Sequence, residues 1–322
     1  MDEKAMWTVF GKQMSPYAVT IWVAGILGLL LFLWQGRKRK PAALALTAVL
    51  GIALGLLGAR LYYVLCRWDL FAEIGWNNFF TAQEEGLESW GAANGAAFWG
   101  AVGGVCLAAL LAGRLTGERV SGLLDALAPS AALGIALSRF AENSIGEGIG
   151  PEVTSEAMQF FPLAVLNEWE EWNYALFLLE GLAAAVIFVL LLDGGRKLRD
   201  GYRARMFLIL YSSCQIVLEA MRRDNFLRWL FVRPSQLASA LVLLGLVVFG
   251  VLRWTRRPEK ERMPKQRLIL CCALFAVMVP VIIWMEFAVD KSPDLSVGMA
   301  YLIEALCCAV MGVTSWQIAM KN

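Results

Sequence analysis

The chain has 322 residues, of which 59% are hydrophobic and only 17% are charged, and its formal net charge at pH 7 is +2. Soluble domains are about 45–50% apolar and about 25% charged, so this composition excludes a soluble enzyme, a disordered chain and a nucleic-acid-binding protein. The chain contains no histidine, which removes the commonest acid–base group at neutral pH and the commonest transition-metal ligand. We therefore expect a multi-pass membrane protein that uses neither a metal nor another cofactor.

Apolar stretches of about 20 residues, the length that crosses a bilayer as a helix, recur along the chain. The predicted spans are residues 17–35, 43–65, 92–113, 121–138, 174–192, 206–221, 236–252, 268–286 and 297–318. The fourth and sixth are short and contain polar side chains. Residues 1–16 lack the basic stretch that opens a cleavable signal peptide, so the first helix is expected to remain as an anchor.

The Lys and Arg residues gather in alternate connections between the spans. The first of these connections is residues 37–40, and the others lie around residues 114–119, 196–205, 253–267 and 321. Because basic loops stay on the cytoplasmic side of a bacterial membrane, this pattern places the N-terminus outside and the C-terminus in the cytoplasm. Most of the loops on the opposite side are acidic.

One outer loop, after the sixth predicted span, is basic and departs from this pattern. It contains Arg222, Arg223, Arg228 and Arg233. Two interpretations are open at this point: the loop binds acidic lipid headgroups, or it pairs with the acidic loop beside it.

A polar stripe occupies one face of the sixth span. Tyr211, Gln215 and Glu219 are spaced four residues apart, which places them on the same side of a helix, and Arg222 follows just beyond. Such a stripe either faces a water-filled site or forms hydrogen bonds that hold neighbouring helices together. Because the stripe ends at a basic cluster, we favour a site.

Two arginines lie near the outer ends of other spans. Arg139 follows the fourth span, close to Glu142 and Glu147, and an arginine there can clamp a phosphate or pair with one of the glutamates. Arg60 lies toward the outer end of the second span and is expected to extend to the headgroups.

Three further acids, Asp125, Glu180 and Glu304, lie singly within predicted spans, and we expect structural roles for them. Together with the arginines and the polar stripe, these features predict an all-α bundle. Its arginine-rich, partly acidic cavity opens toward the outer leaflet and suits a phospholipid headgroup.

Several motifs, in the same order along the chain, resemble those of prolipoprotein diacylglyceryl transferases, bacterial membrane enzymes that attach lipid to lipoprotein precursors. Residues 58–65 (GARLYYVL) resemble the family's Gly-Gly-Arg-x-x-Tyr-Val-Leu stretch. Residues 94–100 (NGAAFWG) stand where the family has Gly-Gly-x-Ser-Phe-His-Gly, and residues 125–129 (DALAP) are similar to its Asp-x-x-Ala-Pro. The resemblance covers roughly residues 15–253, so the last two spans are an addition to it.

Two longer motifs match in part. Residues 138–150 resemble the family signature Gly-Arg-x-Gly/Ala-Asn-Phe-x-Asn-x-Glu-x-x-Gly. The matching residues are Arg139, Ala141, Glu147 and Gly150, and the differing ones are Ser138, Glu142, Asn143 and Ile145. In residues 201–222, Tyr211, Glu219 and Arg222 match the family, but Gln215 stands where the family has an arginine.

The resemblance implies a function in lipoprotein biosynthesis at the bacterial plasma membrane. A lipobox cysteine of a prolipoprotein signal peptide attacks phosphatidylglycerol, and glycerol phosphate leaves. This displacement needs positive charge on the leaving phosphate and a group that ionises the thiol. The family residues usually implicated are two arginines and a histidine, and this chain has Gln215 and Trp99 in the places of one arginine and the histidine.

The resemblance and the polar pattern together predict the site residues. The predicted catalytic residues are Arg139, Glu147 and Glu219. The predicted lipid-binding residues are Arg139, Arg60, Tyr211, Gln215 and Arg222. The predicted cavity-lining residues are Trp99, Gly100, Glu142 and Gly150. Candidates to replace the histidine are Glu142, Glu147 and Glu219, and candidates to replace the arginine are Arg60, Arg222 and Arg223.

We divide the chain into a transferase-like membrane domain, residues 1–255, and a basic cytoplasmic linker with a two-helix extension, residues 256–322. Two other functions remain open. The first is a catalytically inactive homologue that binds phospholipid or a lipoprotein precursor. The second is a small transporter, although the sequence shows no inverted repeat.

Overall fold

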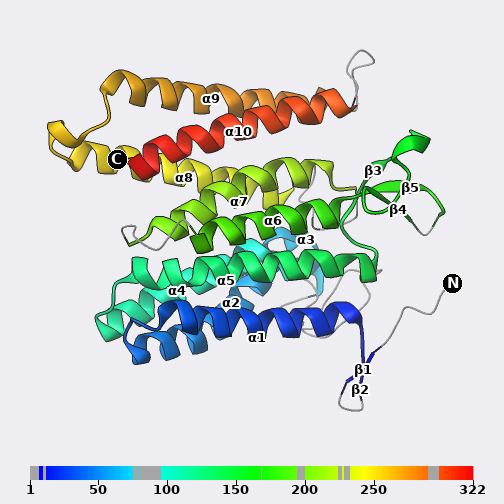
Figure 1. Cartoon of the computed structure of the whole chain (residues 1–322), viewed down its shortest axis with the longest axis horizontal. Coiled ribbons are helices and arrows are strands. Elements are labelled where there is room, and N and C mark those ends of the chain that lie inside the picture. Colours follow the sequence, from blue (N-terminus) through cyan, green and yellow to red (C-terminus); the bar gives the residue numbers. More distant parts are fainter. Residues whose placement is uncertain are drawn as a thin grey trace.

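The computed structural model describes residues 7–9, 12–74, 79, 96–167, 169–193, 200–223, 227, 233–288 and 297–321. Long helices run side by side through most of this part of the chain (Figure 1). They are α1 (Pro16–Gly36), α2 (Pro41–Cys66), α4 (Phe98–Thr116), α5 (Val120–Ala141), α6 (Leu176–Asp193), α7 (Tyr202–Met221), α8 (Pro234–Arg256), α9 (Lys265–Ala288) and α10 (Val297–Lys321).

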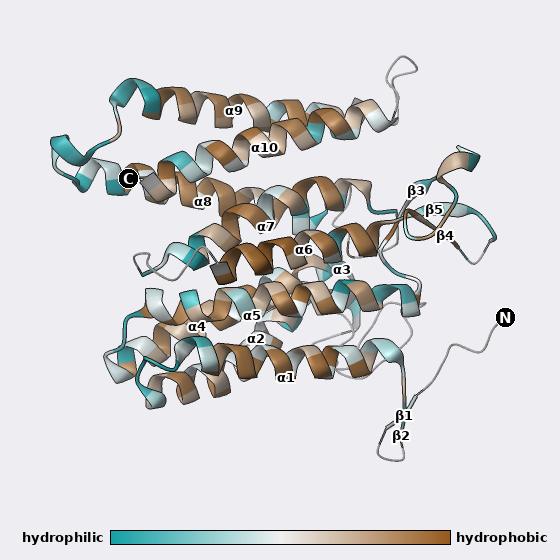
Figure 2. Ribbon diagram, viewed as in Figure 1, coloured by the Kyte–Doolittle hydropathy of each residue, from teal (hydrophilic) through white to brown (hydrophobic). Residues whose placement is uncertain are grey.

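The prediction of an all-α multi-pass membrane protein is confirmed. Within the described residues, eight helices are long and apolar enough to cross a membrane, and α6 is a shorter apolar helix. The sides of the helices are hydrophobic along most of their length, and hydrophilic residues gather at their ends (Figure 2). Large apolar side chains such as Trp22 and Leu56 are exposed on these sides, where a bilayer provides an apolar environment.

Two predicted helix starts are wrong. Ala97 has extended backbone angles, so α4 begins at Phe98 rather than at 92, and residues 92–95 lie outside the described residues. Helix α7 begins at Tyr202, four residues before the predicted start. Asp125 of α5 accepts hydrogen bonds from the backbone N–H groups of Gly201 (2.6 Å) and Ala204 (2.9 Å). This carboxylate caps the N-terminus of α7, so the structural role expected for Asp125 is confirmed.

Helices α2 and α4 touch through their backbones. A Cβ atom added to Gly104 would lie 2.0 Å from the carbonyl oxygen of Leu54, and one added to Gly100 would lie 2.2 Å from that of Gly58. Only glycine allows such an approach, which is a common way for membrane helices to pack. At the other side of the bundle, α10 packs against α7, α8 and α9.

Small elements lie at one end of the helix bundle. Strands β1 (Trp7–Val9) and β2 (Lys12–Met14) form an antiparallel hairpin ahead of α1. Strands β3 (Ile149–Glu152), β4 (Ala164–Leu166) and β5 (Trp172–Ala175) form an antiparallel sheet in the order β3-β5-β4. This sheet connects α5 to α6 at the same end as the hairpin (Figure 1). The other short helices are α3 (Trp68–Ile74), η3 (Glu142–Ile145) and η4 (Glu156–Met158), while η5 (Glu259–Glu261) lies in the connection between α8 and α9 at the opposite end (Figure 1).

A network of ion pairs joins three connections at the opposite end. Arg39 contacts Asp200 at 2.7 Å and Glu118 at 3.4 Å, and Arg119 contacts Asp200 at 3.3 Å. The connections α1–α2, α4–α5 and α6–α7 therefore meet at one end of the bundle, as the alternation of basic loops requires. Which end is cytoplasmic stays a prediction.

This network predicts an acid-sensitive contribution to stability. The Arg39 guanidinium lowers the pKa of Asp200, and the backbone N–H of Lys40 lowers the pKa of Glu118. A depressed carboxyl pKa stabilises the fold above the unfolded value of about 4, and the stabilisation is lost as the pH falls through the folded pKa. We expect Asp200→Asn to lower the unfolding temperature at pH 6. The loss in the free energy of unfolding should not exceed about 1 kcal/mol, because solvent screens the ion pair.

The measurement is thermal unfolding of the purified protein in detergent at several pH values. The difference in unfolding temperature between the variant and the parent protein should shrink as the pH is lowered from 6 to 3. A difference that stays constant from pH 6 to pH 3 would contradict the electrostatic origin.

Candidate functional site

Four charged side chains meet inside the protein at the end that carries the β-sheet. They are Arg139 in the last turn of α5, Glu142 in η3, Glu180 in α6 and Arg222 at the C-terminus of α7. Their side chains are 12%, 6%, 2% and 0% exposed, in that order. Charges withdrawn from water to this degree are tolerated only when they are paired.

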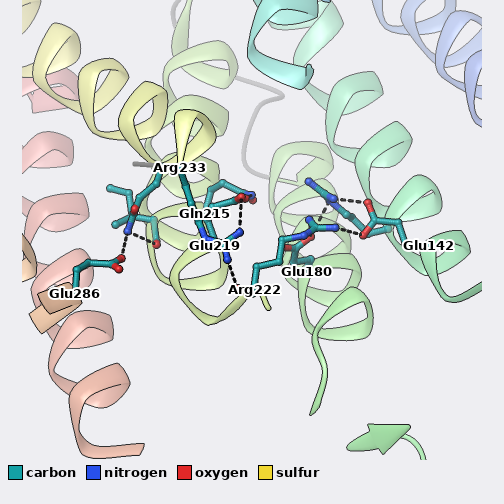
Figure 3. Close-up of polar contacts among 10 residues, drawn as sticks. Glu142, Glu180, Gln215, Glu219, Arg222, Arg233 and Glu286 are labelled. Atoms are coloured by element: carbon teal, nitrogen blue, oxygen red, sulfur yellow. Dashed lines mark hydrogen bonds and ion pairs between the residues drawn. The ribbon is translucent and has the colours of Figure 1, made fainter. Parts of the chain in front are cut away.

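The four side chains form a closed ring in which each arginine contacts both glutamates (Figure 3). Arg139 contacts Glu142, and its Nε lies 2.8 Å from an oxygen of Glu180. Arg222 lies 3.0 Å from Glu142 and 3.3 Å from Glu180. We call these four residues the charged ring. It joins helices α5, α6 and α7 and the connection between α5 and α6.

The sequence after α5 explains how Glu142 reaches the ring. Gly146 and Gly148 have φ angles of +74° and +72°, which turn the chain back toward α6. The carbonyl of Gly148 accepts a hydrogen bond of 2.8 Å from the backbone N–H of Phe177, close to the start of α6. A Cβ atom at Gly148 would lie 2.6 Å from Phe177 and 2.9 Å from a carboxylate oxygen of Glu142. Glycine is therefore required for this turn to hold Glu142 near Glu180.

A second polar group adjoins the ring on α7. Gln215 donates a hydrogen bond of 2.9 Å to Glu219, one turn further along the helix. The other oxygen of Glu219 lies 3.7 Å from the guanidinium of Arg233, which precedes α8. Arg233 also donates to the backbone carbonyl of Arg222, and so it links this second group to the charged ring (Figure 3).

Aromatic side chains of α4 and α7 pack together beside the charged ring. Tyr211 stacks on Phe207 with ring centres 5.5 Å apart, and the rings of Phe98 and Trp99 lie 5.0 and 6.0 Å from it. The Tyr211 hydroxyl lies beside Arg139. Trp99 donates its indole N–H to the carbonyl of Ser235 in the first turn of α8, at 3.1 Å.

The structure brings together most of the residues predicted for the site. The charged ring and the second polar group contain Arg139, Glu142, Gln215, Glu219 and Arg222, with Tyr211 and Trp99 beside them. Glu147 is half-buried just after η3, and its backbone N–H binds the carbonyl of Glu142. The catalytic and binding roles of these residues stay predictions.

Arg60 and two glycines have other surroundings. Arg60 is only 3% exposed, lies over the rings of Tyr63 and Phe71, and donates to the carbonyl of Phe79. The expectation that it extends to the headgroups is therefore wrong, because its cation is held inside the protein. Gly100 lies at the contact between α2 and α4, and Gly150 packs against Tyr174 of β5. Both glycines occupy packing positions in the described structure.

Sequence reasoning missed two members of the site. Glu180 was expected to be isolated, which is wrong because it contacts both ring arginines. An acid in a membrane helix needs a partner, and this need was the available signal. Arg233 was recognised only as part of a basic loop, although it contacts Glu219. No local spacing indicates that contact, because the two residues are 14 positions apart in the chain.

A bundle of membrane helices with a buried arginine–glutamate ring at one end defines an integral membrane protein with a charged intramembrane site. Of the ring residues, Arg139 and Glu142 lie in residues 138–150, which resemble the transferase signature, and Arg222 lies in residues 201–222, which resemble a second family motif. The sequence model for prolipoprotein diacylglyceryl transferase matches residues 4–252, and the chain belongs to this family. The resemblance seen in the motifs is thereby confirmed.

Curated relatives carry the name phosphatidylglycerol–prolipoprotein diacylglyceryl transferase. The relative from Listeria welshimeri is 30% identical over 248 residues, which cover 74% of this chain and 86% of the relative. The relative from Shouchella clausii is 29% identical over 253 residues, covering 76% and 88%. A Streptomyces coelicolor protein, named as transferase 1, is 30% identical over 254 residues, covering 73% and 69%. These names favour a transferase over an inactive homologue.

Proposed function

We propose that this protein transfers a diacylglyceryl group from phosphatidylglycerol to the lipobox cysteine of prolipoproteins in a bacterial plasma membrane. The cysteine sulfur forms a bond to the glycerol carbon, the bond from that carbon to the phosphate oxygen breaks, and glycerol phosphate leaves. The thiol proton passes to one of the candidate carboxylates, Glu142, Glu147 or Glu219. The observation that carries the proposal is the placement of Arg139, from the family signature, in the charged ring.

Arg139 is the ring arginine that we assign to the lipid phosphate. Its side chain is 12% exposed, whereas that of Arg222 is fully buried, so Arg139 is the one that a ligand can reach. A guanidinium can donate two parallel hydrogen bonds to a phosphate. Arg222 then keeps Glu142 and Glu180 in place while Arg139 turns toward the lipid.

The proton acceptor in this proposal is a carboxylate, because Trp99 cannot accept a proton. Glu147 lies outside the charged ring and is half-buried, while Glu219 already accepts a hydrogen bond from Gln215. We propose that Glu147 and Glu219 orient the lipid headgroup and the arginines that bind it. Tyr211 lines the site.

The proposal includes the topology and the domain division predicted from the sequence. The N-terminus lies outside and the C-terminus in the cytoplasm, so that the charged ring faces the outer leaflet. Residues 1–255 form the transferase domain, and residues 256–322 form the linker and the two-helix extension. The meeting of three basic connections at the end opposite the ring supports this orientation.

Replacing Arg139 with alanine is expected to reduce transfer by about 100-fold or more, because a donor to the developing charge is lost. The assay uses purified protein in detergent, labelled phosphatidylglycerol and a lipobox peptide, with the Listeria welshimeri relative beside it. Arg139→Lys keeps the charge but loses the two-pronged geometry and should also be impaired. The exposed Arg256 supplies the control, since Arg256→Ala should retain full activity.

Full activity of Arg139→Ala would show that Arg139 does not bind the lipid phosphate during transfer. Absence of transfer by the parent protein, with the relative active in the same assay, would instead favour an inactive homologue that binds lipid.

A further inference from the structure

Arg233 is a buried cation that the family signature does not contain. It is 9% exposed and lies immediately before α8, where its guanidinium reaches back to the end of α7. One nitrogen lies 3.7 Å from Glu219, and another donates to the carbonyl of Arg222. Arg233 therefore lies close to Gln215 and Glu219 (Figure 3).

The charged ring by itself is electrically balanced. Its two arginines face two glutamates, each within contact of both partners. A phosphate diester carries one negative charge, and the phosphate monoester that leaves approaches two. A balanced ring has no surplus positive charge to offset this increase, so a cation from outside the ring that can move to the phosphate would stabilise the charge that develops there.

Arg233 is a buried cation next to Glu219, the hydrogen-bond partner of Gln215. Its 3.7 Å contact with Glu219 is longer than the ring distances of 2.8 to 3.3 Å and exceeds ordinary hydrogen-bond length. If Arg233 turns away, Glu219 still accepts the hydrogen bond from Gln215. The positive end of the α8 dipole lies at the same place and also favours an anion.

The other arginines proposed as substitutes are engaged elsewhere. Arg223 donates to the hydroxyl of Tyr301 in α10, and Arg60 lies among aromatic rings. Arg222 is fully buried between the two ring glutamates.

We propose that Arg233 binds the phosphate of the lipid substrate and neutralises it as glycerol phosphate leaves. This proposal rests on the proposed transfer function. In the resting protein Arg233 pairs with Glu219. When the lipid occupies the site, the guanidinium moves to the phosphate, and Gln215 retains Glu219. Arg233, which precedes α8, thus places a positive charge close to Gln215, whose side chain is uncharged.

The test compares Arg233→Gln, Arg233→Lys and Arg233→Gly in the transfer assay. We expect Arg233→Gln to lower kcat by about 100-fold or more, with a smaller loss for Arg233→Lys. Glycerol phosphate, the leaving product, should inhibit the parent protein and inhibit Arg233→Gln much less. Added guanidinium ion should restore part of the activity of Arg233→Gly. Arg223→Gln, in the same loop, is the matched control and should keep the inhibition by glycerol phosphate.

A purely structural role gives a different result. If Arg233 only neutralises Glu219, then Arg233→Gln should lower the unfolding temperature, leave product inhibition unchanged and show no rescue by guanidinium. That set of results, in a parent protein that transfers lipid, would overturn the Arg233 proposal while leaving the function intact. A parent protein without transfer activity, beside an active relative, would instead overturn the function on which the proposal rests.

Discussion

Replacing Arg222 with glutamine is expected to destabilise the protein by about 3–5 kcal/mol, because one partner of a buried ionic network is removed. The Arg222 side chain is 0% exposed and contacts both Glu142 and Glu180. Without it, two buried carboxylates share Arg139 alone. The backbone carbonyl of Arg222 also holds Arg233, so a shift of this residue would disturb both polar groups.

The measurement is thermal unfolding in detergent, with a second variant that restores the balance of charge. Arg222→Gln combined with Glu180→Gln leaves one arginine and one glutamate in the ring, and should recover part of the lost stability. Arg256→Gln, at an exposed position on α8, is the control for the loss of a cation. A double variant as unstable as Arg222→Gln alone would show that charge imbalance is not the cause.

The second large effect is expected at the contact between α2 and α4. Leucine in place of Gly104 should prevent folding or cost more than about 3 kcal/mol, since overpacking in a core that cannot relax is expensive. A Cβ atom there meets the carbonyl oxygen of Leu54 at 2.0 Å and the backbone nitrogen of Gly55 at 2.9 Å. These neighbours are backbone atoms, so the two helices themselves would have to separate.

The neighbouring residue provides a matched control. A Cβ atom at Gly103 has nothing within 4 Å, so Gly103→Leu adds the same side chain to the same helix without a clash. The yield of monodisperse protein and its unfolding temperature should fall sharply for Gly104→Leu and stay near the parent values for Gly103→Leu. Equal effects at both positions would point to a general intolerance of leucine in α4 instead of backbone contact.

The transmembrane helices were predictable because each carries its own apolar stretch, and every predicted span overlaps a helix of the described structure. The differences arise where distant residues decide the outcome. The early start of α7 depends on Asp125, which reaches Gly201 and Ala204 from another helix. The β3–β5 sheet was not predicted, because its strands have only three or four residues and too few side chains to show an alternating pattern.

The site was predictable only in part for the same physical reason. Arg139 and Glu142 are three residues apart, and Gln215 and Glu219 are four apart, so helical spacing brings each pair together. Glu180 joins the ring only because α6 packs against α5 and α7. Arg233 contacts Glu219 from 14 positions further along the chain, a separation for which helical spacing makes no prediction.

The position of α10 has a consequence for how substrates arrive. Because α10 lies along α7 and α8, it covers part of the circumference of the transferase domain that would otherwise face lipid. Molecules that diffuse in the membrane therefore cannot reach the part of the bundle surface that α10 covers. Under the proposed function, a phospholipid and a signal peptide would both dock from the remaining sides of the bundle, so α10 would reduce the number of directions from which they can approach.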